Sequence, residues 1–291
     1  AHQDRRCDHH ASSHVALEGL QRPVPEHERL HRHAHESRHA LQDAAPIARP
    51  RLQLHVLRVK VVPARADLRQ HPHRLDHLGI AQVEKLLLNG EAARVEALVG
   101  LLQADGLIVH INPLQEWLQP EGDHYSRPPI VTLQALLEAV SFPVIVKEVG
   151  QGMGYNSLKA LFELPLAAVD FAANGGTNFS RLELLRSDPM LMEAFAPLAL
   201  VGHPAEEMVA WANELQAELG PRMLCRQVII SGGIKNFLDG YYLMEKSQIP
   251  SIFGQASAFL KYARGPYEEL QRYVKTQIDG LAIAKALLKV K

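Results

Sequence analysis

Hydrophobic and polar positions follow two alternating patterns in the chain from residue 78 onward. Short, nearly continuous apolar runs are separated by longer segments in which apolar residues recur every three or four positions. The short runs predict strands that are buried on both faces, as in a parallel sheet, and the longer segments predict amphipathic helices. We expect six strands, at residues 78–82, 107–111, 143–149, 167–172, 228–231 and 251–253.

Helical spacing is clearest in four of the intervening segments. We expect helices over residues 92–104, 132–140, 204–219 and 267–290. Thr132 is the expected N-cap of the second helix, and Gly220 is expected to end the third.

Strands and helices that alternate along a chain predict an α/β fold on a parallel sheet. A TIM barrel and a doubly wound sheet both fit this alternation. Glycines or polar groups follow every expected strand, and the chemistry of a TIM barrel lies at the carboxyl ends of its strands. We therefore expect a TIM (β/α)8 barrel, with its first strands missing or scrambled.

The first quarter of the chain has a different composition. Residues 1–77 hold 13 of the 16 histidines and 12 arginines, but only one lysine, one glycine and one isoleucine. They contain no Phe, Tyr, Trp, Met, Asn or Thr. Three interpretations fit: a metal site on the histidine run at 31–39, a disordered polar tail, or a GC-rich gene translated out of frame.

We favour the third interpretation, with the frame restored close to residues 77 and 78. No carboxylate or cysteine set completes a metal site around the histidine run, and the other histidines scatter without regular spacing. Residues 1–77 are then a segment that is not native-like, and residues 78–291 are the barrel portion. Residues 52–62 nevertheless alternate enough to form a strand.

Length and charge narrow the class of protein further. The chain has 291 residues and a formal net charge of −1, which suits a large α/β domain and gives no electrostatic reason to expect nucleic acid as a partner. Cys7 and Cys225 make no disulfide framework. No apolar run approaches the roughly 20 residues that span a bilayer, and no signal peptide is visible. We expect a cytoplasmic protein without membrane contact.

A dense set of polar groups follows the second expected strand. The apolar run gives way to His110, Asn112, Gln115, Glu116, Gln119, Glu121 and Asp123. This pattern is typical of a buried strand that ends at the rim of an active site. Glu116 is a candidate magnesium ligand, since Mg²⁺ usually takes one or two carboxylates and the phosphates of a substrate. His110 could contact a substrate or simply pack.

Glycines mark the ends of later strands. The sequence SGGIK, residues 231–235, follows one strand, and GQAS, residues 254–257, follows the next. Glycines let backbone N–H groups approach an anion, and a helix that starts there adds its dipole. Two such junctions in succession favour a phosphate site over a pair of tight turns. NGGT, residues 174–177, ends another strand with a hydroxyl and further amides.

Lys147 lies inside the apolar run at residues 143–149. A charge in a buried strand is costly unless it is paired or functional. Lys147 could meet an anionic ring system or a phosphate, or it could form a salt bridge with Glu148 or Asp170.

Taken together, these motifs resemble a known family. The blocks are HINPLQE with QPEGD, PVIVKEVG, AVDFAANGGTNF and SGGI, and from about residue 78 onward they are similar to type 2 isopentenyl-diphosphate isomerase. The LQE–QPEGD block is specific, whereas many flavin and phosphate barrels share SGGI. The resemblance implies an FMN-dependent TIM barrel that interconverts isopentenyl diphosphate and dimethylallyl diphosphate with Mg²⁺. It also implies that NADPH or another reductant reduces the flavin.

The resemblance also implies roles for individual residues. Gln115 would be the catalytic residue beside the reacting alkene, and Glu116 would hold the Mg²⁺ that bridges to the diphosphate. His110 and Asn112 would line the substrate pocket together with Gln115. The implied FMN-binding residues are Lys147, Thr177, Gly232, Gly233, Ile234, Lys235, Ala256 and Ser257. The family commonly forms oligomers, so we expect a homo-oligomer.

The chain departs from the family pattern at several points. His77 stands where the family has an Asn that contacts the flavin, and Ala172 where it has a Ser. The family's Arg-Lys diphosphate clamp and Ser-Met-Thr flavin loop have no counterpart in residues 1–77. A barrel left open at six strands exposes two sheet edges, so we expect poor FMN binding, an activity that is impaired or absent, and a tendency to aggregate.

Three alternatives stay open at this point. One is another FMN-dependent TIM barrel of the α-hydroxy-acid oxidase type, although the LQE–QPEGD block argues against it. Another is an inactive product with a frameshifted N-terminal segment. The last is a histidine-rich metal-binding protein built on residues 1–77.

Overall fold

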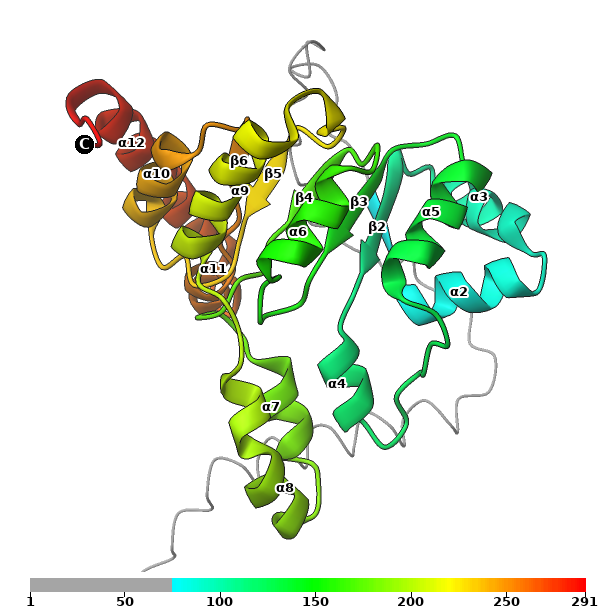
Figure 1. Cartoon of the computed structure of the whole chain (residues 1–291). Coiled ribbons are helices and arrows are strands. Elements are labelled where there is room, and N and C mark those ends of the chain that lie inside the picture. The colour runs from blue at the N-terminus through cyan, green and yellow to red at the C-terminus, as the bar shows by residue number, and fades with distance from the viewer. Residues whose placement is uncertain (1–74) are drawn as a thin grey trace, which may run out of the picture. The chain divides into compact units, whose positions relative to one another are not determined.

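The structure is a computed structural model that describes residues 75–291 (Figure 1). The described residues belong to one unit of the chain, Val56–Lys291. The predictions made for residues 1–74, which are the histidine-rich metal site, the out-of-frame segment and the strand at 52–62, lie outside the described residues. The predicted boundary between residues 77 and 78 falls within the first described strand and stays a prediction.

Six parallel strands form one sheet in the order of the sequence. The strands are β1 (Leu75–Gly79), β2 (Gly106–His110), β3 (Val144–Lys147), β4 (Ala168–Asp170), β5 (Val228–Ile230) and β6 (Ser251–Phe253). A doubly wound sheet reverses its order at a switch point, and the described strands show no reversal. They are consecutive βα units, as in the wall of a TIM barrel, and the predicted parallel α/β class is confirmed. Within the described residues the sheet is open, with β1 and β6 at its edges.

Helices connect the strands and continue after the last one (Figure 1). Before β5 they are α2 (Ile80–Leu88), α3 (Ala92–Leu101), α4 (Pro113–Leu118), α5 (Pro129–Ala139), α6 (Tyr155–Phe162), α7 (Phe179–Leu184), α8 (Pro189–Phe195) and α9 (Ala205–Leu219), with the 3-10 helices η1 (Ala196–Leu200) and η2 (Gly220–Arg222). After β5 they are α10 (Phe237–Lys246), α11 (Ser257–Ala263) and α12 (Tyr267–Leu287).

Two predictions about the ends of elements were wrong. The strand expected at 78–82 is β1, Leu75–Gly79, and α2 begins at Ile80, where Ile80 and Val83 enter the core at helical spacing. Thr132 is not an N-cap, because α5 begins three residues earlier and buries Thr132. Proline at the first helical position of α5 already has the φ angle that a helix requires.

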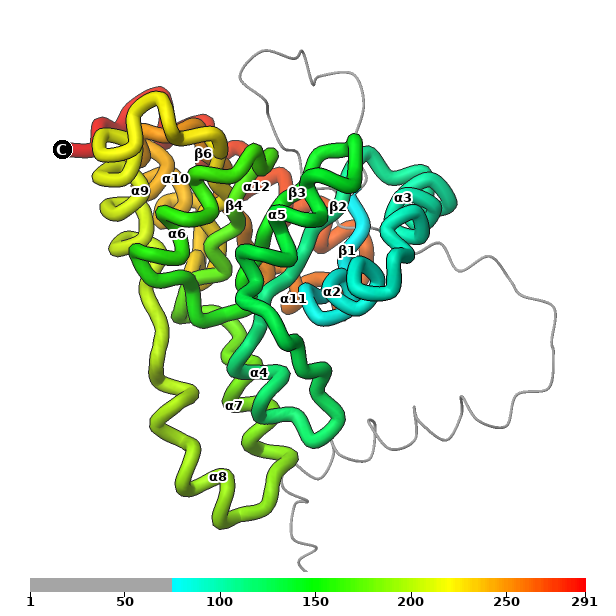
Figure 2. Tube along the Cα trace, turned by 45° about the vertical axis from the view of Figure 1, so that its right-hand side comes forward, coloured from blue at the N-terminus to red at the C-terminus, as the bar shows by residue number. Residues whose placement is uncertain are grey.

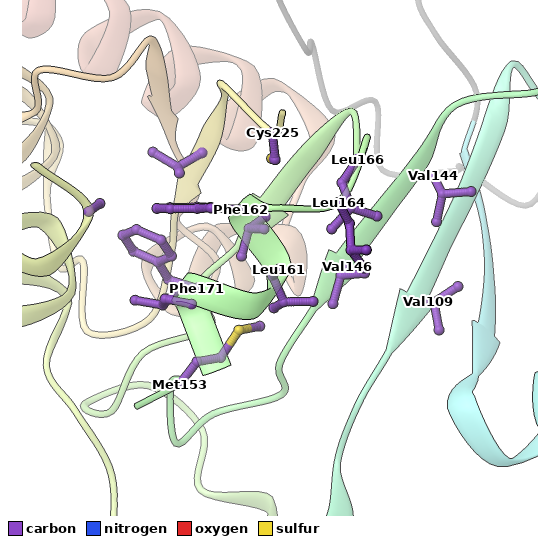
Figure 3. Close-up of a cluster of buried hydrophobic side chains, with 14 of the residues drawn as sticks. Val109, Val144, Val146, Met153, Leu161, Phe162, Leu164, Leu166, Phe171 and Cys225 are labelled. Carbon is purple, nitrogen blue, oxygen red and sulfur yellow. The ribbon is translucent and has the colours of Figure 1, made fainter. Parts of the chain in front are cut away.

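Residues of each strand point alternately to two sides of the sheet, and each side has its own apolar cluster. The larger cluster packs one side of the sheet against the helices, and Figure 3 shows part of it, including Val109, Val146, Phe162 and Phe171. The smaller cluster on the other side is formed by Ile108, Ile145, Ala168 and Ile229.

The side of the sheet with the smaller cluster becomes polar toward the carboxyl ends of the strands. Two residues beyond each member of that cluster, the same side carries His110, Lys147, Asp170 and Ser231. His110 is the register partner of Lys147, and Lys147 is the register partner of Asp170. The strands therefore place a row of polar groups at the end of the sheet where barrel chemistry lies.

Residues 178–201, called here the projecting segment, contain α7, α8 and η1. Figures 1 and 2 show α7 beside α4, with α8 further from the sheet. Asn178 caps α7, because its Oδ1 accepts a hydrogen bond of 2.9 Å from the Arg181 amide. The Trp117 ring of α4 meets the Phe195 ring of α8 edge to face, with centroids 5.3 Å apart. The polar residues after β2 therefore lie beside a segment that is distant in sequence.

None of the helices in residues 75–291 combines the length and the apolar character that crossing a membrane requires.

Candidate functional site

A cavity of about 1460 Å³ lies along strands β4 to β6 and reaches the loops that follow the carboxyl ends of strands β3 to β6. It is larger than the roughly 300–1,000 Å³ of ordinary small-molecule pockets. Ile278 and Leu281 of α12 contribute an apolar part of its wall. The structure brings all eight predicted cofactor residues to this cavity: Lys147, Thr177, Gly232, Gly233, Ile234, Lys235, Ala256 and Ser257.

Two glycine loops form one wall of the cavity and pack against each other through their backbones. Gly175, Gly232 and Gly233 have φ angles of 106°, 86° and 73°. A Cβ atom on Gly232 would lie 2.0 Å from the Ala173 carbonyl oxygen, and one on Gly175 would lie 3.1 Å from the Gly233 Cα. Only glycine fits such close approach with positive φ. Loops of this kind expose backbone N–H groups to an anionic ligand.

The two expected phosphate loops are joined by a hydrogen bond. Gln255 Nε2 donates to the Lys235 carbonyl oxygen at 2.6 Å, and the Lys235 amide donates to Asp239 Oδ2 at 3.0 Å. Asn236 caps α10 by accepting from the amide of Asp239 at 3.0 Å. Residues 231–235 are thus held at one end by a helix cap and at their side by the next loop. This arrangement fits the phosphate of a bound FMN, whose negative charge the loop amides and Lys235 would meet.

Lys147 makes neither of the ion pairs considered from the sequence. Its Nζ donates to the backbone carbonyl oxygen of Glu148 at 2.9 Å, and no ion pair within the described residues joins it to Asp170. The buried Glu148 carboxylate accepts instead from the amides of Gly150, Gln151 and Gly152, at 2.6, 2.6 and 3.0 Å. Burial raises the pKa of Glu148, and these amides oppose the shift. Glu148 therefore shapes the loop after β3 and leaves Lys147 at the cavity.

Asp170 is a buried acid in the cavity wall. The Ser231 hydroxyl donates to Asp170 Oδ1, and the Ala172 amide lies 3.3 Å from the same oxygen and 3.0 Å from Ser231 Oγ. Burial raises the pKa of Asp170, and the charge of Lys147 and the hydrogen bonds oppose that rise. Ala172 has a φ of 40°, a conformation that non-glycine residues rarely adopt and that concentrates at functional sites. The sequence pointed to Asp170 only as a partner for Lys147.

The polar residues after β2 form a second group of contacts around Glu116. Asn112 Nδ2 donates to Glu116 Oε1 at 3.1 Å and to Gln115 Oε1 at 3.3 Å. The amide of Asp123 donates to Glu116 Oε2 at 2.9 Å. His110 is the last residue of β2, and its partial burial lowers its pKa while Glu116 opposes the shift. The four residues predicted for substrate and metal are thus brought together, and we call them, with Gln119, the polar cluster.

A magnesium ion would fit this cluster as a partly hydrated ion. No group of three or more His, Cys, Asp or Glu residues that could hold a metal occurs in residues 75–291. The cluster offers the Glu116 carboxylate and the Asn112 Oδ1, which is buried without a hydrogen-bond partner among the described residues. Mg²⁺ is commonly held by one or two carboxylates and completes its six ligands with water and substrate phosphates.

Sequence reasoning missed Glu183, which joins the polar cluster from α7. This buried carboxylate accepts from Gln119 Nε2 at 3.1 Å and, at the longer distance of 3.5 Å, from Gln115 Nε2. Arg186 Nη1 donates to its other oxygen at 2.7 Å. The available signal was the Asn cap at residue 178 followed by apolar residues at helical spacing, which would have predicted α7.

The fold and the site define a parallel α/β protein of consecutive βα units with a ligand-sized cavity and an adjacent polar cluster at the carboxyl ends of its strands. No protein-family model matches the chain. It is similar to proteins named isopentenyl-diphosphate delta-isomerase from Rickettsia felis (30% identity over 210 residues) and Synechococcus sp. (34% over 212 residues). A third, from Ignicoccus hospitalis, is 31% identical over 196 residues. The names of these relatives confirm the resemblance to isopentenyl-diphosphate isomerase. They do not specify the flavin-dependent type.

These similarities cover much of the chain but only part of each relative. They include 72%, 72% and 65% of this chain, and 57%, 58% and 51% of the R. felis, Synechococcus and I. hospitalis proteins. The chain thus spans little more than half the length of the curated relatives it matches. Among solved structures, a mandelate oxidase with a monooxide FMN adduct has a TM-score of 0.43 and 10% identity, over 72% of this chain and 58% of that chain. A similarity of this degree carries no argument about function.

Proposed function

We propose that the protein is an isopentenyl-diphosphate delta-isomerase that uses reduced FMN and Mg²⁺ to form dimethylallyl diphosphate. The observation that carries the proposal is that the eight residues expected to bind FMN line one cavity, while those expected to bind substrate and metal cluster at the end of the neighbouring strand β2 and in α4 after it. Names of relatives that are 30–34% identical support the same activity.

Different residues of the cavity are proposed to bind different parts of the cofactor. The two glycine loops and Lys235 would meet the phosphate of FMN, Lys147 would meet its ring, and Thr177 would lie in the FMN region. Bound reduced FMN supplies the acid–base group for moving a proton between allylic carbons, and NADPH or another reductant keeps it reduced. A dry pocket favours this chemistry, because a positioned proton carrier then does not compete with water.

The polar cluster binds and orients the substrate. Glu116 holds Mg²⁺, which neutralises the diphosphate, and His110 and Asn112 line the pocket. Gln115 is the catalytic residue beside the alkene, and its amide is held between Asn112 and Glu183. Partial burial lowers the pKa of His110 and so favours its neutral imidazole form, although Glu116 opposes the shift.

The open sheet supports a further part of the proposal, which is that this chain is impaired. Two strand edges, at β1 and β6, remain unpaired within the described residues. A wall that does not close holds FMN less firmly than a complete barrel does, so we expect weaker cofactor binding than in a full-length relative. The proposal also includes that residues 1–77 are translated out of frame. It further includes that the protein is cytoplasmic and forms a homo-oligomer.

Titration of the purified chain with FMN, followed by an isomerase assay with dithionite-reduced FMN and Mg²⁺, tests the function. We expect saturable FMN binding, and a weak activity that Glu116→Gln removes together with its Mg²⁺ dependence. Glu163→Gln, which alters a surface ion pair with Arg222, is the matched control and keeps the wild-type behaviour. A wild-type chain that neither binds FMN nor forms product would contradict the proposal.

The frame of the N-terminal segment has its own test. The nucleotide sequence upstream of the codon for residue 78 should yield the missing Arg-Lys and Ser-Met-Thr motifs after a one-base shift. An intact reading frame with the same 77 residues in related strains would exclude the out-of-frame interpretation.

A further inference from the structure

Gln151 links the loop after β3 to the projecting segment through its side chain. Its Nε2 donates to the carbonyl oxygens of Leu198, at 3.3 Å, and Val201. Its Oε1 accepts from the Ser180 hydroxyl at 2.9 Å. One half-buried amide thus contacts α7, η1 and the residue that follows η1.

The backbone of Gln151 is held as firmly as its side chain. Its amide donates to Glu148 Oε2 at 2.6 Å, and its carbonyl oxygen accepts from the His203 amide at 2.8 Å. The flanking residues Gly150 and Gly152 donate to the same Glu148 oxygen. The side chain of Gln151 therefore projects from a loop whose position is fixed by a buried carboxylate next to the cavity.

The projecting segment carries this link onward to the polar cluster. Ser180, which donates to Gln151, lies one helical turn before Glu183 on α7. Glu183 in turn accepts hydrogen bonds from Gln115 and Gln119. A continuous set of contacts runs from the cavity loop, through Gln151 and α7, to the residue proposed to act on the substrate.

We propose that Gln151 is a positioning residue that sets the place of α7, and thereby of Glu183 and Gln115, relative to the cavity. The functional part of this inference rests on the proposed function. Within residues 75–291, the side-chain hydrogen bonds of Gln151 go to Leu198, Val201 and Ser180 and to none of the residues expected to contact substrate, so its effect is transmitted through α7. Loss of its side chain loosens the polar cluster and leaves the glycine loops of the cavity intact.

A matched control is available in α9. Asn213 of α9 also bridges two backbone groups with one amide side chain, because its Nδ2 donates to the Lys246 carbonyl at 2.9 Å and its Oδ1 accepts from the Gln248 amide at 2.8 Å. It belongs to neither the cavity nor the cluster. Gln151→Leu and Asn213→Leu each remove a side-chain bridge of the same chemistry.

Hydrogen exchange of the full chain without ligand decides the inference. In Gln151→Leu we expect amides of residues 179–201 and of residues 113–122 to exchange about tenfold faster, because several hydrogen bonds are lost. Ser180→Ala removes one of them and should give about a threefold increase in the same segments, which keeps the test valid if Gln151→Leu does not fold. Asn213→Leu should leave both segments within about twofold of wild type.

Ligand affinities separate positioning from general damage. For Gln151→Leu we expect Mg²⁺ with inorganic diphosphate to bind about tenfold more weakly, and FMN to bind within about twofold of wild type. Failure of the wild type to bind either ligand would count against the proposed function, whereas the exchange measurement would still decide the role of Gln151. Exchange in residues 113–122 that is the same in Gln151→Leu, Ser180→Ala and Asn213→Leu would overturn the inference.

Discussion

The cavity and the polar cluster differ in how far they depend on backbone atoms and on side chains. One part of the cavity wall is made by backbone, at Gly232 and Gly233, where positive φ and close backbone neighbours leave no room for a side chain. The polar cluster is made by side chains from the end of β2 and from α4 with its two flanking residues. Glu183 of α7 joins it through hydrogen bonds that span more than sixty positions of the sequence. Backbone walls tolerate no added atom, while a side-chain cluster can lose one member and persist in weakened form. The following predictions test this contrast.

Gly232→Ala should have the largest effect, because it attacks the backbone wall. The new Cβ would lie 2.0 Å from the Ala173 carbonyl oxygen at a φ of 86°. We expect the free energy of unfolding to fall by about 3 kcal/mol or more, and we expect FMN binding to be lost. Urea denaturation and FMN titration measure both.

Gly100→Ala is the control for that substitution. Gly100 lies in α3, and a Cβ there would meet nothing within 4 Å. Alanine in a helix interior should stabilise the protein by about 0.5–1 kcal/mol relative to glycine. If Gly232→Ala matched wild type in stability and FMN affinity, the backbone wall would not be the feature that forms the cavity.

Glu183→Ala attacks the side-chain cluster and should have an intermediate effect. Gln115, Gln119 and Arg186 lose their shared acceptor, so we expect stability to fall by about 1–3 kcal/mol and isomerase activity by at least about tenfold. FMN affinity should be unchanged. A parallel loss of FMN binding would show that the two regions are not separate. Glu163→Ala, which breaks an exposed ion pair with Arg222, should cost less than about 1 kcal/mol.

Asp170→Asn tests the acid at the base of the cavity. In the folded protein the pKa of Asp170 lies above its ordinary value of 3.8, because burial disfavours the charged form. Its favourable contribution is therefore complete below that ordinary value and is lost as the pH rises through the folded-state pKa. We expect Asp170→Asn to melt at a higher temperature than wild type at pH 8, with the difference shrinking toward acid pH. Equal melting temperatures across the range would mean that burial does not disfavour the carboxylate.

His110→Gln, a substitution in the polar cluster, should have the smallest effect on stability. Partial burial lowers the pKa of His110 below 6.5 in the folded protein, so the unfolded chain takes up a proton first on acidification. Wild-type stability should fall as the pH drops through the unfolded-state value near 6.5 and then level off below the folded-state pKa. Urea unfolding at pH 7.5 and pH 5.5 should show a smaller difference in the variant. A larger difference in His110→Gln would reverse the assigned sign.

The contrast between the two regions also explains what the sequence revealed. Glycine loops were found from the sequence because a positive φ requires a particular residue type at a particular position, as at Gly232 and Gly233. Strands β2 to β5 were found because burial on both faces requires uninterrupted apolar runs. These constraints are local, so a short window of sequence carries them.

The rest of the site depends on contacts between distant segments. Nothing near Gln115 in the sequence indicates Glu183, since the pairing arises from the packing of α4 beside α7. The start of α5 was misplaced because a polar residue, Thr132, looks like a cap, whereas two prolines before it begin the helix and tertiary packing buries the threonine. The salt bridge between Lys147 and Glu148, one of the alternatives that the sequence left open, does not form, because loop amides already bind the buried Glu148 carboxylate.

The sequential order of the strands has a consequence for how the chain assembles. Each described strand pairs with the one synthesised just before it, so the newest strand is always the growing edge of the sheet. A ribosome-bound chain can therefore add one βα unit at a time onto a finished surface, without waiting for a later strand to insert between earlier ones. In a doubly wound sheet the first strands lie in the middle and receive partners on both sides. Here synthesis from β1 to β6 runs in one direction along the described part of the sheet.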